Sequence, residues 1–485
     1  MSPPLISKAA ARYTGAGGKE HCSLCRHFSP RRGGRCARVL GDISPMGWCK
    51  LFSREMRGMV ADASSFNGGG GGPSLALDFM TPGTLDPRLT FTRASTATYF
   101  NSAGVMQTAA VNAPRWDYDP VTLALRGMLV EEARTNVIRN STMVGAVAGT
   151  PGTDPTGWVI NLPAGVTKTI VATGTDRGIA YIDYRLQAAA ATQGNLNILF
   201  APTTTGGAAA TAATVYTQSL YMTPIAGTFS LVGSVFTVFM NQFDAGGANL
   251  GAQTSTNFVT APYVVGDPLT SHRPAYTWAA TPANTAFVQP ALRLPIPAGV
   301  VDFTVRIGGP MLEAGAFATS YVPTTSAAVT RAADNLQILP ANMGFWVSPG
   351  GSWFAEFIGQ TTPPSGSPRV VGYLGGSNRA HIFVTGANNV GIYDGAAFAP
   401  TAATLPLNVV ARAASAWGAG IGRVCLNGGA VASGSLATGF GDTGLAGTGI
   451  LGSGAATEYL TGYVRRVRYW SRILTDAEMQ TVTTP

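Results

Sequence analysis

The chain has 485 residues, of which 46% are hydrophobic and only 12% are charged, and it contains 61 glycines and 31 prolines. This composition excludes an intrinsically disordered chain and a protein built from long charged helices. It predicts many short strands joined by turns. We expect no membrane segment, because no run of about 20 apolar residues is present. The first residues lack the apolar core of a signal peptide, so we expect synthesis in a reducing cytoplasm.

The net charge of +8 is concentrated at one end of the chain. Residues 1–60 hold eleven of the 32 Lys and Arg residues and three of the 24 acidic residues, and the rest of the chain is balanced. A basic arm of this kind could contact nucleic acid, an acidic protein surface or its own anionic cofactor. An anionic cofactor is the simplest of the three, and we expect no nucleic-acid partner.

Four of the five cysteines lie in this arm, at Cys22, Cys25, Cys36 and Cys49. A CxxC pair followed by two further cysteines suits a Cys₄ metal site. Zinc is one candidate, although zinc ribbons usually carry two CxxC pairs. Two disulfides are a second alternative, which a reducing cytoplasm disfavours. Free core thiols are less favoured than either.

The arm resembles the high-potential iron–sulfur proteins over about residues 15–58. The similar features are the CxxC pair and the Gly47-Trp48-Cys49 ending, which an aromatic residue follows. The resemblance implies a [4Fe–4S] cluster on the four cysteines, with zinc as the alternative, and it implies that Phe28, Trp48 and Phe52 pack around the cluster. A segment of roughly 45 residues buries too little apolar area to fold alone, so we expect the cluster to be structural rather than redox-active.

The remainder of the sequence predicts a mainly β protein. Residues 1–60 form the Cys₄ attachment domain, and five consecutive glycines at 68–72 predict a flexible linker over 61–75. Alternating apolar residues then predict a β connector over 76–140 and two antiparallel β-sandwiches, over 141–325 (jelly-roll type) and 326–485. The tail "LTDAEMQTVT" predicts a short helix capped by Thr475 or Asp476.

Two phrases resemble segments that recur in virion proteins of tailed bacteriophages, known as head spikes, head fibres or tail proteins. The first phrase covers 89–136 and the second covers 308–334. In such proteins the second phrase closes a jelly roll similar to carbohydrate-binding modules. The C-terminal "LTGYVRRVRYWSRILTDAEMQTVT" resembles the last strand and tail of concanavalin A-like and laminin-G-like lectin domains.

These resemblances imply a fibre or spike that is assembled in the host cytoplasm and carried on the virion. Residues 1–60 would attach it to capsid or tail proteins, and its sandwiches would bind host-surface polysaccharide. Phage fibres are by default homotrimers, so we expect a homotrimer. The candidates for stacking on sugar rings are four aromatic residues of the last sandwich, Trp353, Tyr373, Tyr393 and Trp417. The competing interpretation places most of them in the core, because aromatic residues in alternating strands usually face inward.

We expect no enzymatic activity, because acidic residues are sparse and no Ser-His-acid constellation is evident. Glu131, Glu132 and Arg134 stand at the end of an expected strand, where an Arg–carboxylate pair would fix a corner. Two alternatives stay open: a tailspike enzyme that degrades glycans, and a redox iron–sulfur protein with lectin appendages.

Overall fold

The computed structural model describes residues 28–29, 35–36, 72–202, 207–346, 350–360, 369–375, 378–393, 398–418, 420–436, 448–451 and 460–485. The chain divides into two compact units, Met1–Pro73 and Ser74–Pro485. In the first unit β1 (Phe28–Ser29) pairs antiparallel with β2 (Arg35–Cys36), and the register sets Phe28 opposite Cys36.

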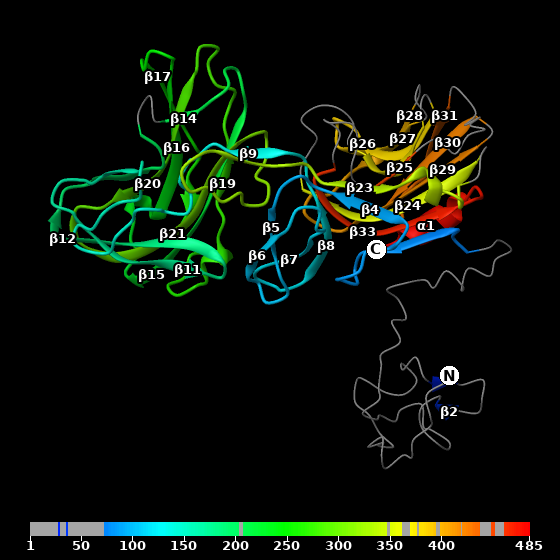
Figure 1. The fold of residues 1–485 in the computed structure, drawn as a ribbon, viewed down its shortest axis with the longest axis horizontal. Helices are drawn as coiled ribbons and strands as arrows, with labels where there is room; N and C mark the ends of the chain where they lie inside the picture. Colours follow the sequence, from blue (N-terminus) through cyan, green and yellow to red (C-terminus); the bar gives the residue numbers. More distant parts are fainter. Residues whose placement is uncertain are drawn as a thin grey trace. The chain divides into compact units, whose positions relative to one another are not determined.

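The second unit is mainly β, and it confirms the predicted class of two antiparallel β-sandwiches (Figure 1). In the first sandwich one sheet has the order β10 (Val159–Asn161), β13 (Gly194–Leu199), β20 (Phe287–Ile296), β16 (Val235–Phe243), β17 (Asn249–Thr254), with β14 (Ala208–Ala209) beside β20 and β18 (Phe258–Val259) beside β16. The other has the order β11 (Thr167–Asp176), β12 (Ile179–Ala191), β21 (Gly299–Ala314), β15 (Tyr216–Gly227), β19 (Ala275–Thr277).

The core of the first sandwich follows from the period-two pattern of its strands. On β21, Val301, Phe303, Val305 and Ile307 are buried, and all four belong to one apolar cluster. Alternate residues of a strand point to the same face, so this pattern lays one face of β21 against the opposite sheet. Short 3₁₀ turns connect some of the strands, η3 (Val232–Ser234) and η4 (Leu269–Ser271) in this sandwich and η5 (Pro340–Asn342) in the next.

The second sandwich also has two sheets. One has the order β28 (Phe398–Thr404), β27 (Asn389–Tyr393), β26 (Asn378–Val384), β25 (Arg369–Gly375), β32 (Thr448–Leu451), β23 (Asn335–Ile338), β4 (Leu89–Thr92). The other has the order β31 (Ala432–Ser435), β30 (Ile421–Leu426), β29 (Ala411–Gly418), β24 (Gly351–Gly359), β33 (Gly462–Trp470), β8 (Leu125–Val130), β7 (Trp116–Tyr118), with β3 (Leu75–Asp78) also beside β33.

The predicted C-terminal helix is present as α1 (Asp476–Thr483). Thr475 is its N-cap, and the Thr475 side chain and Glu478 form a reciprocal capping box. Within the described residues, no helix has the length and apolarity that crossing a membrane would require.

The strands between residues 75 and 130 correct the predicted domain boundaries. The expected β connector over 76–140 is wrong as a separate element, because β3, β4, β7 and β8 are strands of the second sandwich. Leu75 pairs with Tyr469, and Phe91 pairs with Leu336. Such pairings join residues hundreds of positions apart, and a local alternation pattern carries no information about them.

The first sandwich is therefore inserted into the second. The chain leaves the second sandwich through β9 (Arg134–Asn136) and returns through β22 (Val329–Arg331), and these two strands pair with each other. A hairpin of β5 (Ala97–Phe100) and β6 (Met106–Ala109) precedes the point of departure. The insertion brings the two recurring phrases together.

Candidate functional site

The structure corrects two of the four predicted sugar-binding aromatic residues. Trp353 is 0% exposed and Trp417 is 1% exposed, and both belong to the core of the second sandwich. The Tyr469 ring lies 4.8 Å from the ring of Trp353 and 6.1 Å from that of Trp417. Alternate residues of β24 and β29 point into the core, and the two tryptophans are among these residues. Neither ring can therefore stack on a sugar.

The other two aromatic candidates lie on strands whose positions are described, Tyr373 on β25 and Tyr393 on β27. Their side chains fall outside the described residues.

The predicted cluster residues also fall largely outside the described part of the chain. Cys22, Cys25, Cys49, Trp48 and Phe52 are not described. Phe28 and Cys36 are placed only as backbone partners in β1 and β2. Within the described residues, no group of three or more His, Cys, Asp or Glu residues is arranged to hold a metal ion.

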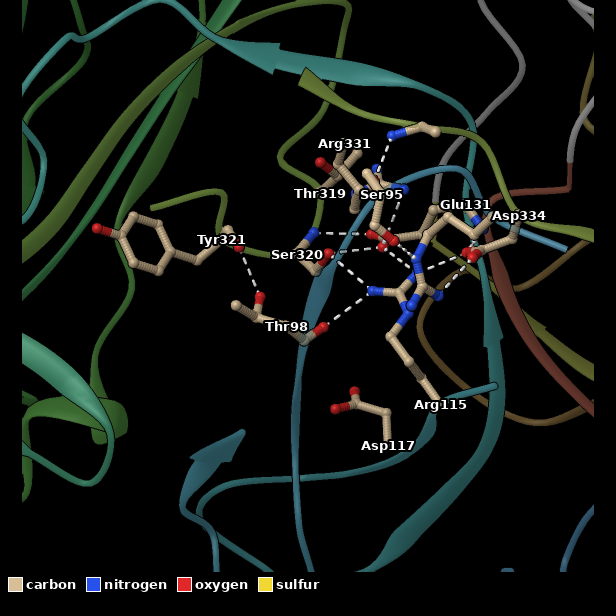
Figure 2. Close-up of polar contacts among 12 residues, drawn as sticks. Ser95, Thr98, Arg115, Asp117, Glu131, Thr319, Ser320, Tyr321, Arg331 and Asp334 are labelled. Carbon is tan, nitrogen blue, oxygen red and sulfur yellow. Dashed lines mark hydrogen bonds and ion pairs between the residues drawn. The ribbon is translucent and has the colours of Figure 1, made fainter. Parts of the chain in front are cut away.

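The second unit contains a buried ionic network, which we call the joint. Its members are Arg93, Arg115, Glu131, Arg331 and Asp334, and each is at most 1% exposed. Figure 2 shows Arg115, Glu131, Arg331 and Asp334 close together. They come from the segments that flank the inserted sandwich, three before it and two after it. The joint therefore lies where the chain leaves and re-enters the second sandwich.

Arg115 is the centre of the joint. One terminal nitrogen, Nη2, lies 2.8 Å from Glu131 Oε2 and 2.5 Å from Asp334 Oδ2. The other, Nη1, donates to the Thr98 carbonyl at 2.9 Å and to Ser320 Oγ at 3.0 Å. A planar guanidinium with several donors suits this convergence on two carboxylates, which a lysine could not reproduce.

Asp334 is shared between two arginines. Its Oδ1 accepts from Arg93 Nη1 at 3.0 Å, and its Oδ2 also accepts from the backbone N–H of Glu131 at 2.9 Å. The Arg93 guanidinium further donates to the carbonyls of Ser95 and Ala110. The carboxylate thus ties together three stretches of backbone that are separate in the sequence.

Glu131 links the joint to the end of the inserted sandwich. Its two carboxylate oxygens accept from the backbone N–H of Ser320 at 2.7 Å and from Ser320 Oγ at 2.6 Å. Burial alone would raise the pKa of Glu131, but Arg331, Arg115 and the Ser320 bonds lower that pKa to about 2. Glu131 is therefore an anion in the folded protein at neutral pH.

The joint carries an excess of positive charge. Three buried guanidiniums face two carboxylates, and among the described residues the Arg331 guanidinium makes no hydrogen bond. The nearest carboxylate to Arg331 Nη1 is that of Glu131, at 3.5 Å. Burial lowers the pKa of Arg93, since desolvation outweighs the attraction of Asp334. Because the cluster has one more guanidinium than carboxylates, its stability depends strongly on each of the two carboxylates.

A further buried carboxylate, that of Glu313, lies close to the joint, because its partner Thr319 precedes Ser320 in the chain. Glu313 is 0% exposed and accepts from the backbone N–H and the hydroxyl of Thr319. Arg134 Nε lies 3.6 Å away, and Arg134 also pairs with Glu132. Burial outweighs these contacts and raises the pKa of Glu313 to about 7.

The Arg–carboxylate pair predicted among Glu131, Glu132 and Arg134 is confirmed between Arg134 and Glu132, whereas Glu131 pairs with Arg115. The partners Asp334 and Ser320 were missed, although both stand in the second recurring phrase. One feature of the sequence could have indicated these partners. Both recurring phrases contain charged or hydroxyl residues among apolar residues, which is expected of segments that contact one another through buried polar groups. The two phrases are the two halves of one joint.

Comparisons with known proteins add little to this picture. No family model matches the chain. A carbohydrate-binding module (CBM40) of a Ruminococcus gnavus IT-sialidase, bound to α2,3-sialyllactose, covers 28% of this chain and 83% of its own at 16% identity and a TM-score of 0.23. A Trypanosoma rangeli sialidase covers 65% of this chain and 68% of its own at 10% identity and a TM-score of 0.26. Domains LG4-5 of mouse laminin α1 cover 57% of this chain and 92% of their own at 12% identity and a TM-score of 0.22. Similarities this low carry no argument on function.

One curated protein is similar over a short stretch. It is an iron oxidase of Acidithiobacillus ferrooxidans, 44% identical over 48 residues. The match covers 10% of this chain and 51% of that protein, so the chain spans about half the length of this relative.

Proposed function

We propose that the protein is a structural fibre or spike of a tailed-bacteriophage virion and that its β-sandwiches bind host-surface glycans. The observation that carries the proposal is that the two phrases resembling virion proteins meet in one buried joint. Every member of the joint is buried, so the phrases specify how the two sandwiches are held together. A protein whose most distinctive residues build a scaffold is suited to displaying binding domains.

The glycan part of the proposal is supported by the lectin-like tail phrase and by the β-sandwich architecture. Sandwiches of this kind place loops and sheet faces where polar and aromatic residues can meet a sugar. The alternative, a glycan-degrading tailspike, would need a pair of catalytic carboxyl groups facing one groove. The buried carboxylates described above are engaged by arginine, serine and threonine side chains, which favours a structural role for them.

The N-terminal part of the proposal concerns attachment. Residues 1–60 would dock on capsid or tail proteins, with a [4Fe–4S] cluster held by Cys22, Cys25, Cys36 and Cys49. The resemblance of residues 15–58 to high-potential iron–sulfur proteins favours iron over zinc. The cluster would supply the cross-links that so small a domain lacks. The assembled protein would be a homotrimer on the virion.

Electron microscopy of purified virions labelled with an antibody against the second unit tests the virion assignment. Label on projections from the head or tail is the expected result, and particles without the chain would overturn the proposal. A fluorescent full-length chain should also bind host cells. Release of oligosaccharides from host polysaccharide by the purified chain would replace the binding function with the enzymatic alternative.

A further inference from the structure

A cavity of about 80 Å³ lies beside the joint, and the four predicted sugar-binding aromatic residues are not part of its walls. Its walls come from several separate stretches of the second unit, among them residues 318–321 of the second recurring phrase. Asp117 and Glu131 belong to the first recurring phrase, Tyr221 and Arg273 belong to the inserted sandwich, and Tyr463 belongs to the second sandwich. The cavity therefore exists only when the joint is assembled.

The volume limits what the cavity can hold. A cavity of about 150 Å³ takes one benzene molecule, and this one measures about 80 Å³. A complete pyranose ring is too large for it. A group of roughly three or four heavy atoms fits, which is the size of a substituent on a sugar ring.

The charges around the cavity favour a neutral group. The charged lining residues are two carboxylates and two guanidiniums, Asp117, Glu131, Arg126 and Arg273. Arg126 Nη2 already contacts Asp119 at 2.6 Å, and Glu131 already contacts Arg115 at 2.8 Å. Arg273 has no carboxylate partner, but it donates to the Thr319 carbonyl at 2.7 Å and to Ser219 Oγ at 3.0 Å. The two lining carboxylates balance the two guanidiniums, so the cavity has no net charge to offset the lost hydration of a charged substituent, and a neutral polar substituent would lose less.

The lining offers a hydrogen-bond donor, an acceptor and an apolar wall. Phe100, Met106 and Leu129 supply apolar surface. The Asp117 carboxylate accepts from the Phe100 N–H at 2.6 Å and from the Tyr463 hydroxyl at 2.7 Å, and a carboxylate can accept more than two bonds.

The Tyr221 hydroxyl is the available donor. Within the part of the chain that the structure describes, this hydroxyl has no hydrogen-bond partner, although the Tyr221 ring lies under Arg273 with its guanidinium 5.3 Å from the ring centre. Tyrosine hydroxyls in binding sites usually find a partner. A ligand that accepts one bond from Tyr221 and donates one to Asp117 would satisfy both groups.

We propose that this cavity binds the acetamido group of an N-acetylated amino sugar, a substrate class that rests on the proposed glycan-binding function. The acetamido group has four heavy atoms and no charge, with one N–H donor, one carbonyl acceptor and one methyl group. The carbonyl accepts from Tyr221, the N–H donates to Asp117, and the methyl group packs against the apolar wall. The sugar ring stays outside the cavity.

Saturation-transfer NMR on the full-length chain tests this inference, with the methyl glycoside of N-acetylglucosamine as probe and the methyl glycoside of glucose as comparison. We expect the strongest saturation on the acetyl methyl group and little on methyl glucoside. Tyr221→Phe should raise the dissociation constant of the probe about fivefold, because it removes one neutral hydrogen bond and keeps the ring. Tyr181→Phe is the matched control, since Tyr181 packs under Arg306 and does not line the cavity.

A second variant keeps the test decisive if Tyr221→Phe folds poorly. Ala318→Leu places a larger side chain in the cavity wall and should abolish probe binding while leaving the unfolding temperature near that of the native chain. Equal binding of both glycosides, or equal effects of Tyr221→Phe and Tyr181→Phe, would overturn the inference. Host-cell binding that persists unchanged in Tyr221→Phe and Ala318→Leu would overturn it while leaving the proposed function in place. A native chain that binds the probe but no host cells would overturn the proposed function and leave the acetamido site standing.

Discussion

Arg115 and Asp334 are 219 positions apart in the sequence, and their side chains meet at 2.5 Å with no exposed surface on either. The whole inserted sandwich lies between them in the chain. Their contact is therefore the point at which the second sandwich closes around the insertion. It also makes the stability of the second unit depend on a few buried charges.

Asp334→Asn should destabilise the second unit severely. The change leaves Arg93 and Arg115 buried with one carboxylate fewer, and an unpaired buried charge costs about 3–5 kcal/mol. Urea unfolding followed by tryptophan fluorescence measures the loss. Asp302→Asn is the control, because the Arg185–Asp302 pair is exposed and its removal should leave the midpoint unchanged. Similar midpoints for the two variants would show that the joint contributes no net stability.

Glu313 should make the protein less stable as pH rises from about 4.5 to about 7. Burial raises its folded-state pKa to about 7 from an ordinary value of 4.5, so in this window the unfolded chain has released a proton that the folded chain still holds. The contribution of Glu313 to the free energy of unfolding is fully present below pH 4.5 and is lost as the pH rises through 7. The total loss is up to about 3 kcal/mol. Thermal unfolding of the native chain and of Glu313→Gln across pH 4–8 gives the difference. Parallel curves for the two proteins would contradict the prediction.

Trp353→Ala and Trp417→Ala should each lower stability by about 3–5 kcal/mol, the usual cost of removing a buried aromatic side chain. The effect should appear in the unfolding midpoint. For comparison, Val409→Ala should have little effect, because Val409 is 52% exposed. A tryptophan variant that kept its stability and lost only glycan binding would restore the original assignment of these rings.

The N-terminal arm should carry iron. Protein purified without oxygen should be brown and contain about four irons per chain if its four thiolates hold a [4Fe–4S] cluster. Cys49→Ser should lose the colour, and Cys425→Ser should keep it, because Cys425 is buried in the second unit. Metal analysis that finds one zinc and no iron would replace the cluster with a zinc site.

The sequence was a good guide to strands and to class, because period-two alternation and turn residues are local signals. It was a poor guide to domain limits, since β3 and β33 pair across nearly the whole chain. The sequence also does not show whether a tryptophan on β24 points into the core or away from it, because every residue of that strand is buried. The corner at Glu131 was predictable from charge within an apolar run, but its partner Asp334 was not, because only the fold brings them together.

The pairing of β9 with β22 has a consequence for how such proteins diversify. Asn136 and Val329 are opposite one another in an antiparallel ladder, so the chain departs and returns at a single place. Any domain whose two ends lie side by side could replace the strands between the recurring phrases without disturbing the rest of the second sandwich. A gene with such borders is suited to exchanging a cassette by recombination, so that a lineage could acquire a new inserted domain in one step while the part of the protein around the cassette keeps its fold.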